Sequence, residues 1–94
     1  MIVGVCTLEL NIPNATSLKD KRQVVKSIVA RLRNQFNVSV AEVDQLGSRQ
    51  SAVIAAVTVS ADRDYAHTLL MRVANWVEQN RLDCYVVDYE IELL

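Results

Sequence analysis

Apolar and polar residues alternate along residues 2–12, which is typical of a β-strand with one buried face. Pro13-Asn14 ends this strand. Apolar residues then recur at three- and four-residue spacing, which predicts an amphipathic helix to about residue 35. Ser17 is the expected N-cap, and Asp20 is the acid of a shortened capping box. The predicted buried stripe of this helix contains Leu18, Val25, Ile28, Val29, Leu32 and Phe36.

The pattern predicts two more strands, a second helix and a fourth strand. Residues 37–45 are typical of a strand, and residues 51–60 are apolar on both faces, as in a central strand. Asp62 is the expected cap of the second helix, and residues 84–93 form the last predicted strand. The core stripe of the second helix is predicted to contain Ala66, Leu69, Leu70, Val73, Ala74 and Val77.

The order βαββαβ in a chain of 94 residues predicts one ferredoxin-like domain over residues 1–94. This α+β sandwich has a four-stranded antiparallel sheet with both helices on one face. The first and last strands are then neighbours, and the alternation predicts that the last strand turns Tyr85, Val87, Tyr89 and Ile91 toward the helices. The helix-free face then carries Val3, Val5, Thr7, Glu9, Asp88, Glu90 and Glu92. We therefore expect an acidic open face with an apolar strip.

The composition is that of an ordinary globular protein, with 51% hydrophobic residues, two Gly and one Pro. The N-terminus has no signal-peptide pattern, and no apolar stretch approaches the ~20 residues that span a bilayer. We expect a cytoplasmic protein without a membrane partner. Cys6 falls in the middle of the first strand and Cys84 near the far end of the neighbouring strand, roughly 15–20 Å away, so we expect unpaired thiols.

Positive charge is concentrated on the first predicted helix, although the chain as a whole has a formal charge of −1. The helix carries six of the ten Lys and Arg residues, namely Lys19, Lys21, Arg22, Lys26, Arg31 and Arg33. All but Lys21 and Arg31 fall within a sector of about 60° on the helical wheel. No acid lies four residues further on to pair with them. Such a row suits phosphate groups, and the alternative is a solvated helix face.

Other candidate sites are weaker. The predicted sheet face lacks aromatic residues on its central strands and is acidic, which argues against base stacking as in RNA-recognition motifs. His67 is the lone histidine, and a surface or partly buried structural role is favoured. Glu42 and Asp44 are expected to face one side, where carboxylates could hold a cation, but a solvated strand face explains them as well. We predict no enzyme, cofactor, metal site or small-molecule substrate.

Three segments closely resemble the YlxP family of short bacterial proteins, a domain of unknown function. They are SLKDKRQVVKSI at residues 17–28, FNVSVAEV at 36–43 and VDYEIE at 87–92, and the resemblance covers essentially the whole chain. It implies a ferredoxin-like fold and no established catalytic residues. Genes of the family often lie beside translation-initiation and ribosome-maturation genes, which implies a role near RNA. Residues 46–49 (LGSR) depart from the acid and Trp common in the family.

Two functional hypotheses follow. In the first, structured RNA or the ribosome binds the first helix through Lys19, Arg22, Lys26 and Arg33, and Lys21 and Arg31 contribute from the edges. In the second, the protein is a homo-oligomeric interaction module that uses an edge strand or the open sheet face. The interface on that face would contain Val3, Val5, Thr7, Asp88, Glu90 and Glu92.

Overall fold

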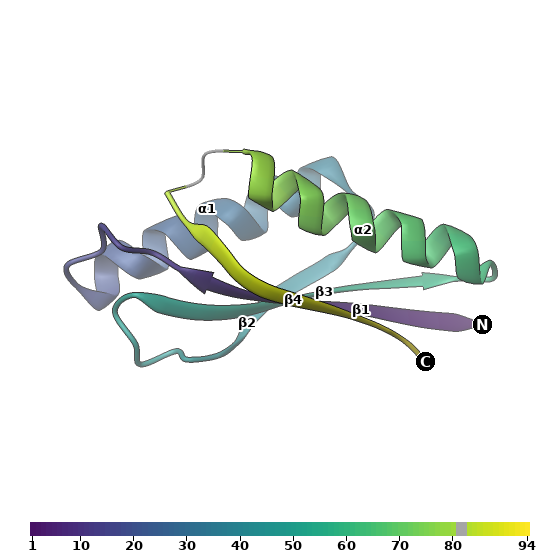
Figure 1. The fold of residues 1–94 in the computed structure, drawn as a ribbon, viewed down its shortest axis with the longest axis horizontal. Helices are drawn as coiled ribbons and strands as arrows, with labels where there is room; N and C mark the ends of the chain where they lie inside the picture. The colour runs from purple at the N-terminus through teal and green to yellow at the C-terminus, as the bar shows by residue number, and fades with distance from the viewer. Residues whose placement is uncertain (81–82) are drawn as a thin grey trace.

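The six elements follow the predicted order along the chain (Figure 1). The computed structural model describes residues 1–80 and 83–94. The elements are β1 (Ile2–Asn11), α1 (Leu18–Gln35), β2 (Ser39–Asp44), β3 (Ser51–Ser60), α2 (Arg63–Gln79) and β4 (Tyr85–Leu93).

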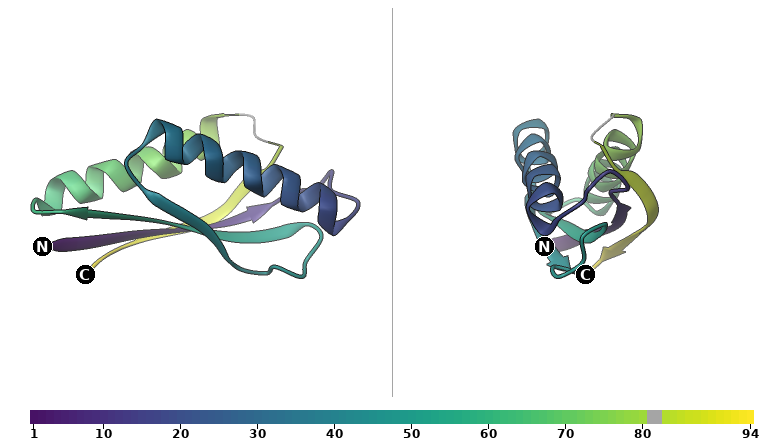
Figure 2. Two further views of the ribbon diagram at one scale, coloured as in Figure 1. Left: turned by 180° about the vertical axis from the view of Figure 1, so that it is seen from behind. Right: turned by 90° about the vertical axis from the view of Figure 1, so that its left-hand side faces the viewer.

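The four strands form one antiparallel sheet in the order β2-β3-β1-β4. Both helices cover the same face, as the end-on view in Figure 2 shows. Helix α1 packs over β2, and α2 packs over β1, β3 and β4. This arrangement confirms the predicted ferredoxin-like fold, with the apolar β3 inside the sheet and β1 beside β4.

Both helices begin at the predicted caps. The Ser17 hydroxyl accepts the backbone N–H of Asp20 at 3.1 Å, and the Asp62 carboxylate caps α2 in the same way. The Asp20 carboxylate turns to Thr16 and accepts its hydroxyl at 2.6 Å and its backbone N–H at 3.1 Å. These hydrogen bonds from Thr16 lower the pKa of Asp20 below its ordinary value of 3.8. The one acid of α1 is thus occupied at the helix start.

The core lies between the helices and the sheet. The six predicted core residues of α2 are all buried, and α1 buries Val25, Ile28 and Leu32. Gly4 lets α2 approach β1 closely, because a Cβ atom at this position would lie 2.8 Å from Cδ1 of Leu70. One buried residue of α1 is charged: Lys21 has no exposed surface.

A β-bulge in β4 corrects one prediction. Glu9 pairs with Asp88 but the next residue of β1 pairs with Val86, so Val87 is an extra residue in β4. Because side chains alternate between the two faces of a strand, one extra residue makes the residues that precede it face the opposite side of the sheet. The prediction that Tyr85 and Val87 face the helices is therefore wrong, and they are 68% and 61% exposed. The prediction holds after the bulge, for Tyr89 and Ile91, which lie opposite core residues of β1.

A second irregularity separates the two carboxylates of β2. Glu42 pairs with Ile54 on the helix side, whereas Asp44 pairs with Val53 on the open side. The prediction that Glu42 and Asp44 face one side is therefore wrong. These two carboxylates cannot share one cation.

The cysteines are unpaired, as predicted. Cys6 lies in β1 opposite Ile91, and Cys84 precedes β4. Burial raises the pKa of the Cys6 thiol to about 11, and burial with the neighbouring Asp83 charge raises that of Cys84.

Within residues 1–80 and 83–94, neither helix has the length and apolar character needed to cross a lipid bilayer.

Candidate nucleic-acid interface

Five of the six predicted cations of α1 are exposed. Four of these form a line along one flank of the helix, and we call them the basic row: Lys19, Arg22, Lys26 and Arg33. Along the helix axis their successive spacings are about 4.5, 6 and 10 Å. Arg31 is exposed too, but it projects from the other flank of α1.

The basic row follows the β2 side of the molecule. Arg33 donates from Nη2 to the carbonyl oxygen of Val40 in β2 at 2.8 Å, and β2 is an edge strand. The opposite flank of α1, with Asp20 and Val24, lines a hollow that it shares with Asp83. The row therefore lies on the flank of α1 nearest the β2 edge of the sheet.

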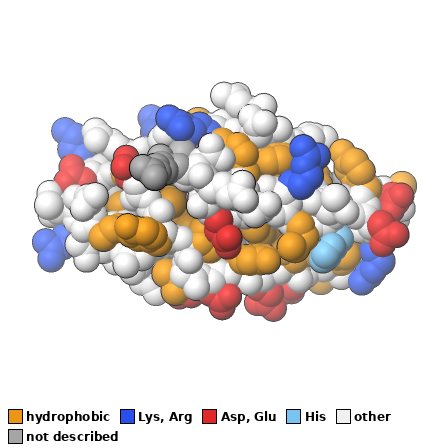
Figure 3. Space-filling model, turned by 45° about the horizontal axis from the view of Figure 1, so that its top comes forward, with side chains coloured by type: hydrophobic (Ala, Val, Ile, Leu, Met, Phe, Trp, Pro, Cys, Tyr) orange, Lys and Arg blue, Asp and Glu red, His pale blue; other side chains and the backbone are white. Residues whose placement is uncertain are grey.

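No ion pair within the described residues neutralises the basic row. In the part of the chain that the structure describes, the one ion pair joins Lys21 to Glu42. Lys19, Arg22 and Lys26 thus have no carboxylate partner there. In Figure 3, several Lys and Arg side chains lie along the upper edge and several Asp and Glu side chains lie along the lower edge, while charges of both signs occur at the two ends.

Lys21 does not belong to this surface. Its ammonium Nζ donates to Oε2 of Glu42 at 2.8 Å and to the carbonyl oxygen of Gln45 at 2.9 Å. Two further carbonyl oxygens, of Leu46 and Ser51, lie 3.3 Å away. Lys21 therefore holds the loop between β2 and β3 against α1. Because it is fully buried, its prediction as a nucleic-acid contact is corrected to a structural role.

The sequence contained a signal for this role. Lys21 precedes Val25 by four residues and Ile28 by seven, so its position falls on the buried stripe of α1. A lysine on such a stripe requires a buried acceptor. That acceptor, Glu42, lies on the same face of β2 as buried Val40.

The six predicted interface residues come together on the helix-free face. Val3, Val5 and Thr7 are partly buried there. In the neighbouring strand β4, Glu92 lies opposite Val5, and Glu90 lies opposite Thr7. Asp88 follows in the same row, so the predicted acidic face with an apolar strip is confirmed.

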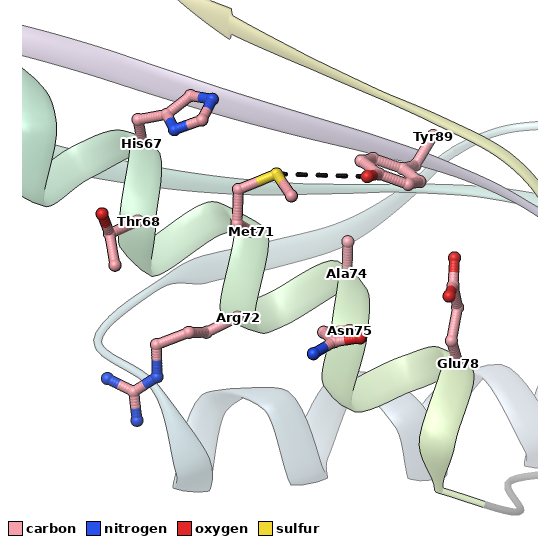
Figure 4. Close-up of a pocket in the computed structure, with 8 residues that line it drawn as sticks. All are labelled: His67, Thr68, Met71, Arg72, Ala74, Asn75, Glu78 and Tyr89. Carbon is pink, nitrogen blue, oxygen red and sulfur yellow. Dashed lines mark hydrogen bonds between the residues drawn. The ribbon is translucent and has the colours of Figure 1, made fainter.

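A separate hollow of about 300 Å³ lies along α2, where Tyr89 of β4 adjoins the helix (Figure 4). His67, Asn75 and Glu78 project from the helix, and the Tyr89 hydroxyl contacts Sδ of Met71 at 4.0 Å. His67 is exposed, and among the described residues no hydrogen bond joins its imidazole to the hydroxyl of Thr68 or Tyr89 in this lining. Among the described residues, no three His, Cys, Asp or Glu side chains are placed to hold a metal ion.

A family model described as "Protein of unknown function (DUF503)" matches residues 3–91. The chain belongs to this family. It is also 34% identical over 77 residues to the uncharacterized protein YlxP of Bacillus subtilis (strain 168), which covers 82% of this chain and 84% of that protein. The predicted family resemblance is thereby confirmed.

Among solved structures, the de novo designed protein Foldit4 matches this DUF503 member with a TM-score of 0.55 at 12% identity. The match covers 100% of this chain and 97% of that one. At this identity the likeness shows the fold alone.

Proposed function

We propose that this DUF503 protein is a non-enzymatic, cytoplasmic RNA-binding protein that contacts structured RNA, free or in the ribosome, through the basic row of α1. The observation that carries the proposal is the absence of any carboxylate partner for Lys19, Arg22 and Lys26 in the described chain. Cations without an internal counterion are available to neutralise phosphates, and each neutralised phosphate releases condensed counterions.

The helix fixes the spacing of these cations before RNA binds. Lys19, Arg22 and Lys26 occupy successive turns of one rigid element whose buried side is anchored in the core. Only their side chains lose freedom on binding, which limits the entropic cost. Arg33 adds a fourth charge but already donates one hydrogen bond to Val40, so we expect a smaller contribution.

Recognition should follow RNA shape and charge rather than base identity. On the open face, the central strands β1 and β3, both described throughout, present Val, Thr and Ala at their central positions without an aromatic side chain for base stacking. The acids of β4 on that face repel phosphate. The sheet face is therefore unsuited to RNA.

Binding to ribosomal RNA fragments, measured by fluorescence anisotropy across a salt series, tests the proposal. Three to four phosphate contacts predict a log–log slope of about −3, so affinity should fall roughly fiftyfold between about 50 and 200 mM salt. The variant R22E/K26E should bind at least tenfold more weakly, with a flatter slope.

The matched control is R63E/R72E, which makes the same change in net charge at exposed positions of α2. It should retain most of the affinity. Equal losses in both variants would show that only net charge matters, and undiminished binding by R22E/K26E would refute the role of the basic row.

A further inference from the structure

The helix-free face of the sheet has an apolar centre. It is formed by the apolar strip, which we define as Val3, Val5, Val53, Ala55 and Val57, all partly buried. These residues come from the two central strands and adjoin one another across the β1–β3 register. The helices lie on the other face, so nothing in the described chain covers the strip (Figure 2).

Carboxylates border this strip on the β4 side. We define the acidic margin as Glu9, Asp88, Glu90 and Glu92, all exposed. Glu9 lies directly opposite Asp88, a like-charged pair that destabilises the isolated sheet. A shallow hollow of about 240 Å³ lies among these acids, with Thr7 and Val53 in its floor. An incoming cationic side chain with an apolar stem fits both the charge and the floor of this hollow.

The charge of the face decides which kind of occupant it suits. Among the residues that the described register places on this face, none is Lys, Arg or His. Two copies packed face to face would therefore offer the acidic margin no counterion, whichever way the two sheets are turned. The exposed side of α1 in a second copy is basic, but its side chains are polar and the apolar stripe of the helix is already buried in the core. It would therefore leave the valines uncovered. RNA is repelled.

We propose that the helix-free face is a docking site for a cationic amphipathic helix of another protein. The apolar stripe of that helix packs on the apolar strip, and its Lys or Arg residues pair with the acidic margin. Such a helix would add a third layer to the sandwich and relieve the repulsion between Glu9 and Asp88. The inference does not depend on RNA binding, because the basic row lies on the other side of the sheet.

The probe is a synthetic peptide of Leu and Lys at helical spacing, and the peptide control has the same composition in scrambled order. Binding to the full chain is measured by anisotropy at about 150 mM salt, where non-specific attraction between exposed charges is screened. The wild type should bind the amphipathic peptide and not the scrambled one.

Two variants separate the acidic margin from the apolar strip. D88N/E90Q should weaken binding about tenfold, since it removes two exposed ion pairs and part of the field of the margin. V5T/V57T keeps the β-branched shape but adds hydroxyls to the strip, and it should weaken binding several-fold. The matched control D64N/E78Q changes the same net charge on α2 and should bind within about twofold of the wild type.

Three outcomes would overturn the inference: equal binding by all variants, equal binding of the scrambled peptide, or a dimer in sedimentation that V5T/V57T dissociates. The last outcome would make a second copy the occupant. Loss of RNA binding by R22E/K26E with peptide binding intact would show that the two surfaces act independently. Failure of the peptide test alone would leave the RNA proposal standing.

Discussion

Replacing Lys21 with Met tests the role of the buried ammonium group. Met has a similar length and fills the same space among the apolar residues of α1, so the variant removes the charge with little change in packing. Four acceptors lose their donor: the Glu42 carboxylate and the three backbone carbonyl groups around Nζ.

The expected cost is about 3 kcal/mol in the free energy of unfolding. Breaking a buried ion pair by removing one partner costs roughly 3–5 kcal/mol. We take the lower end because the Glu42 side chain is 14% exposed and water can reach it once Lys21 is gone. For a domain of this size, that loss lowers Tm by roughly 15 °C.

Urea unfolding followed by circular dichroism measures this change, with Lys26→Met as the matched control. Lys26 is exposed on the same helix, so its substitution should change stability by less than about 0.5 kcal/mol. Hydrogen exchange should show faster exchange for amides of the β2–β3 loop in the Lys21 variant. Adding Glu42→Gln to Lys21→Met should cost little more, because the carboxylate is already unpaired.

If Lys21→Met unfolds within about 0.5 kcal/mol of the wild type, the hydrogen bonds of Nζ do not stabilise the fold and the structural assignment of Lys21 is wrong. A large loss in the free energy of unfolding, with unchanged amide hydrogen exchange in the β2–β3 loop, would instead show that Lys21 stabilises α1 without holding the loop.

Two further predictions concern the core. Gly4→Ala should lower the free energy of unfolding by about 1 kcal/mol or more in urea titration, because the added methyl meets Leu70 and must displace it; a neutral or stabilising effect would contradict the close packing of α2 on β1. At pH 7–8, Cys84 should react with a thiol reagent before Cys6, as followed by mass spectrometry. The pKa of Cys6, raised to about 11, keeps this buried thiol protonated, so its modification should require unfolding, and fast labelling in the native state would refute its burial.

The order and type of the elements could be predicted because each has strong local periodicity. The predicted range of β3 agrees with the structure, α1 ends at Gln35 as expected, and the six core positions of α2 are all buried. The caps Ser17 and Asp62 could also be predicted from the local sequence, since a cap contacts residues only two or three positions away.

The errors in the sheet arise from two bulges. A bulge changes the pairing of two strands that are far apart in the sequence, and the alternation within one strand does not reveal it. Tyr85 and Val87 therefore appeared to continue the helix-facing row of β4, and Glu42 and Asp44 appeared to share a side. The acids of β4 after its bulge were placed correctly, because the alternation there is uninterrupted.

The sequence by itself determined the fold, the family and the concentration of positive charge on the first helix. Only the tertiary structure decided which of those charges are available. Lys21 and Lys26 belong to the same charged segment, yet one is enclosed by acceptors from β2 and the following loop and the other faces solvent. The reason is physical: local sequence sets the direction of a side chain from its helix, whereas its partner is set by the packing of segments that lie more than twenty residues away.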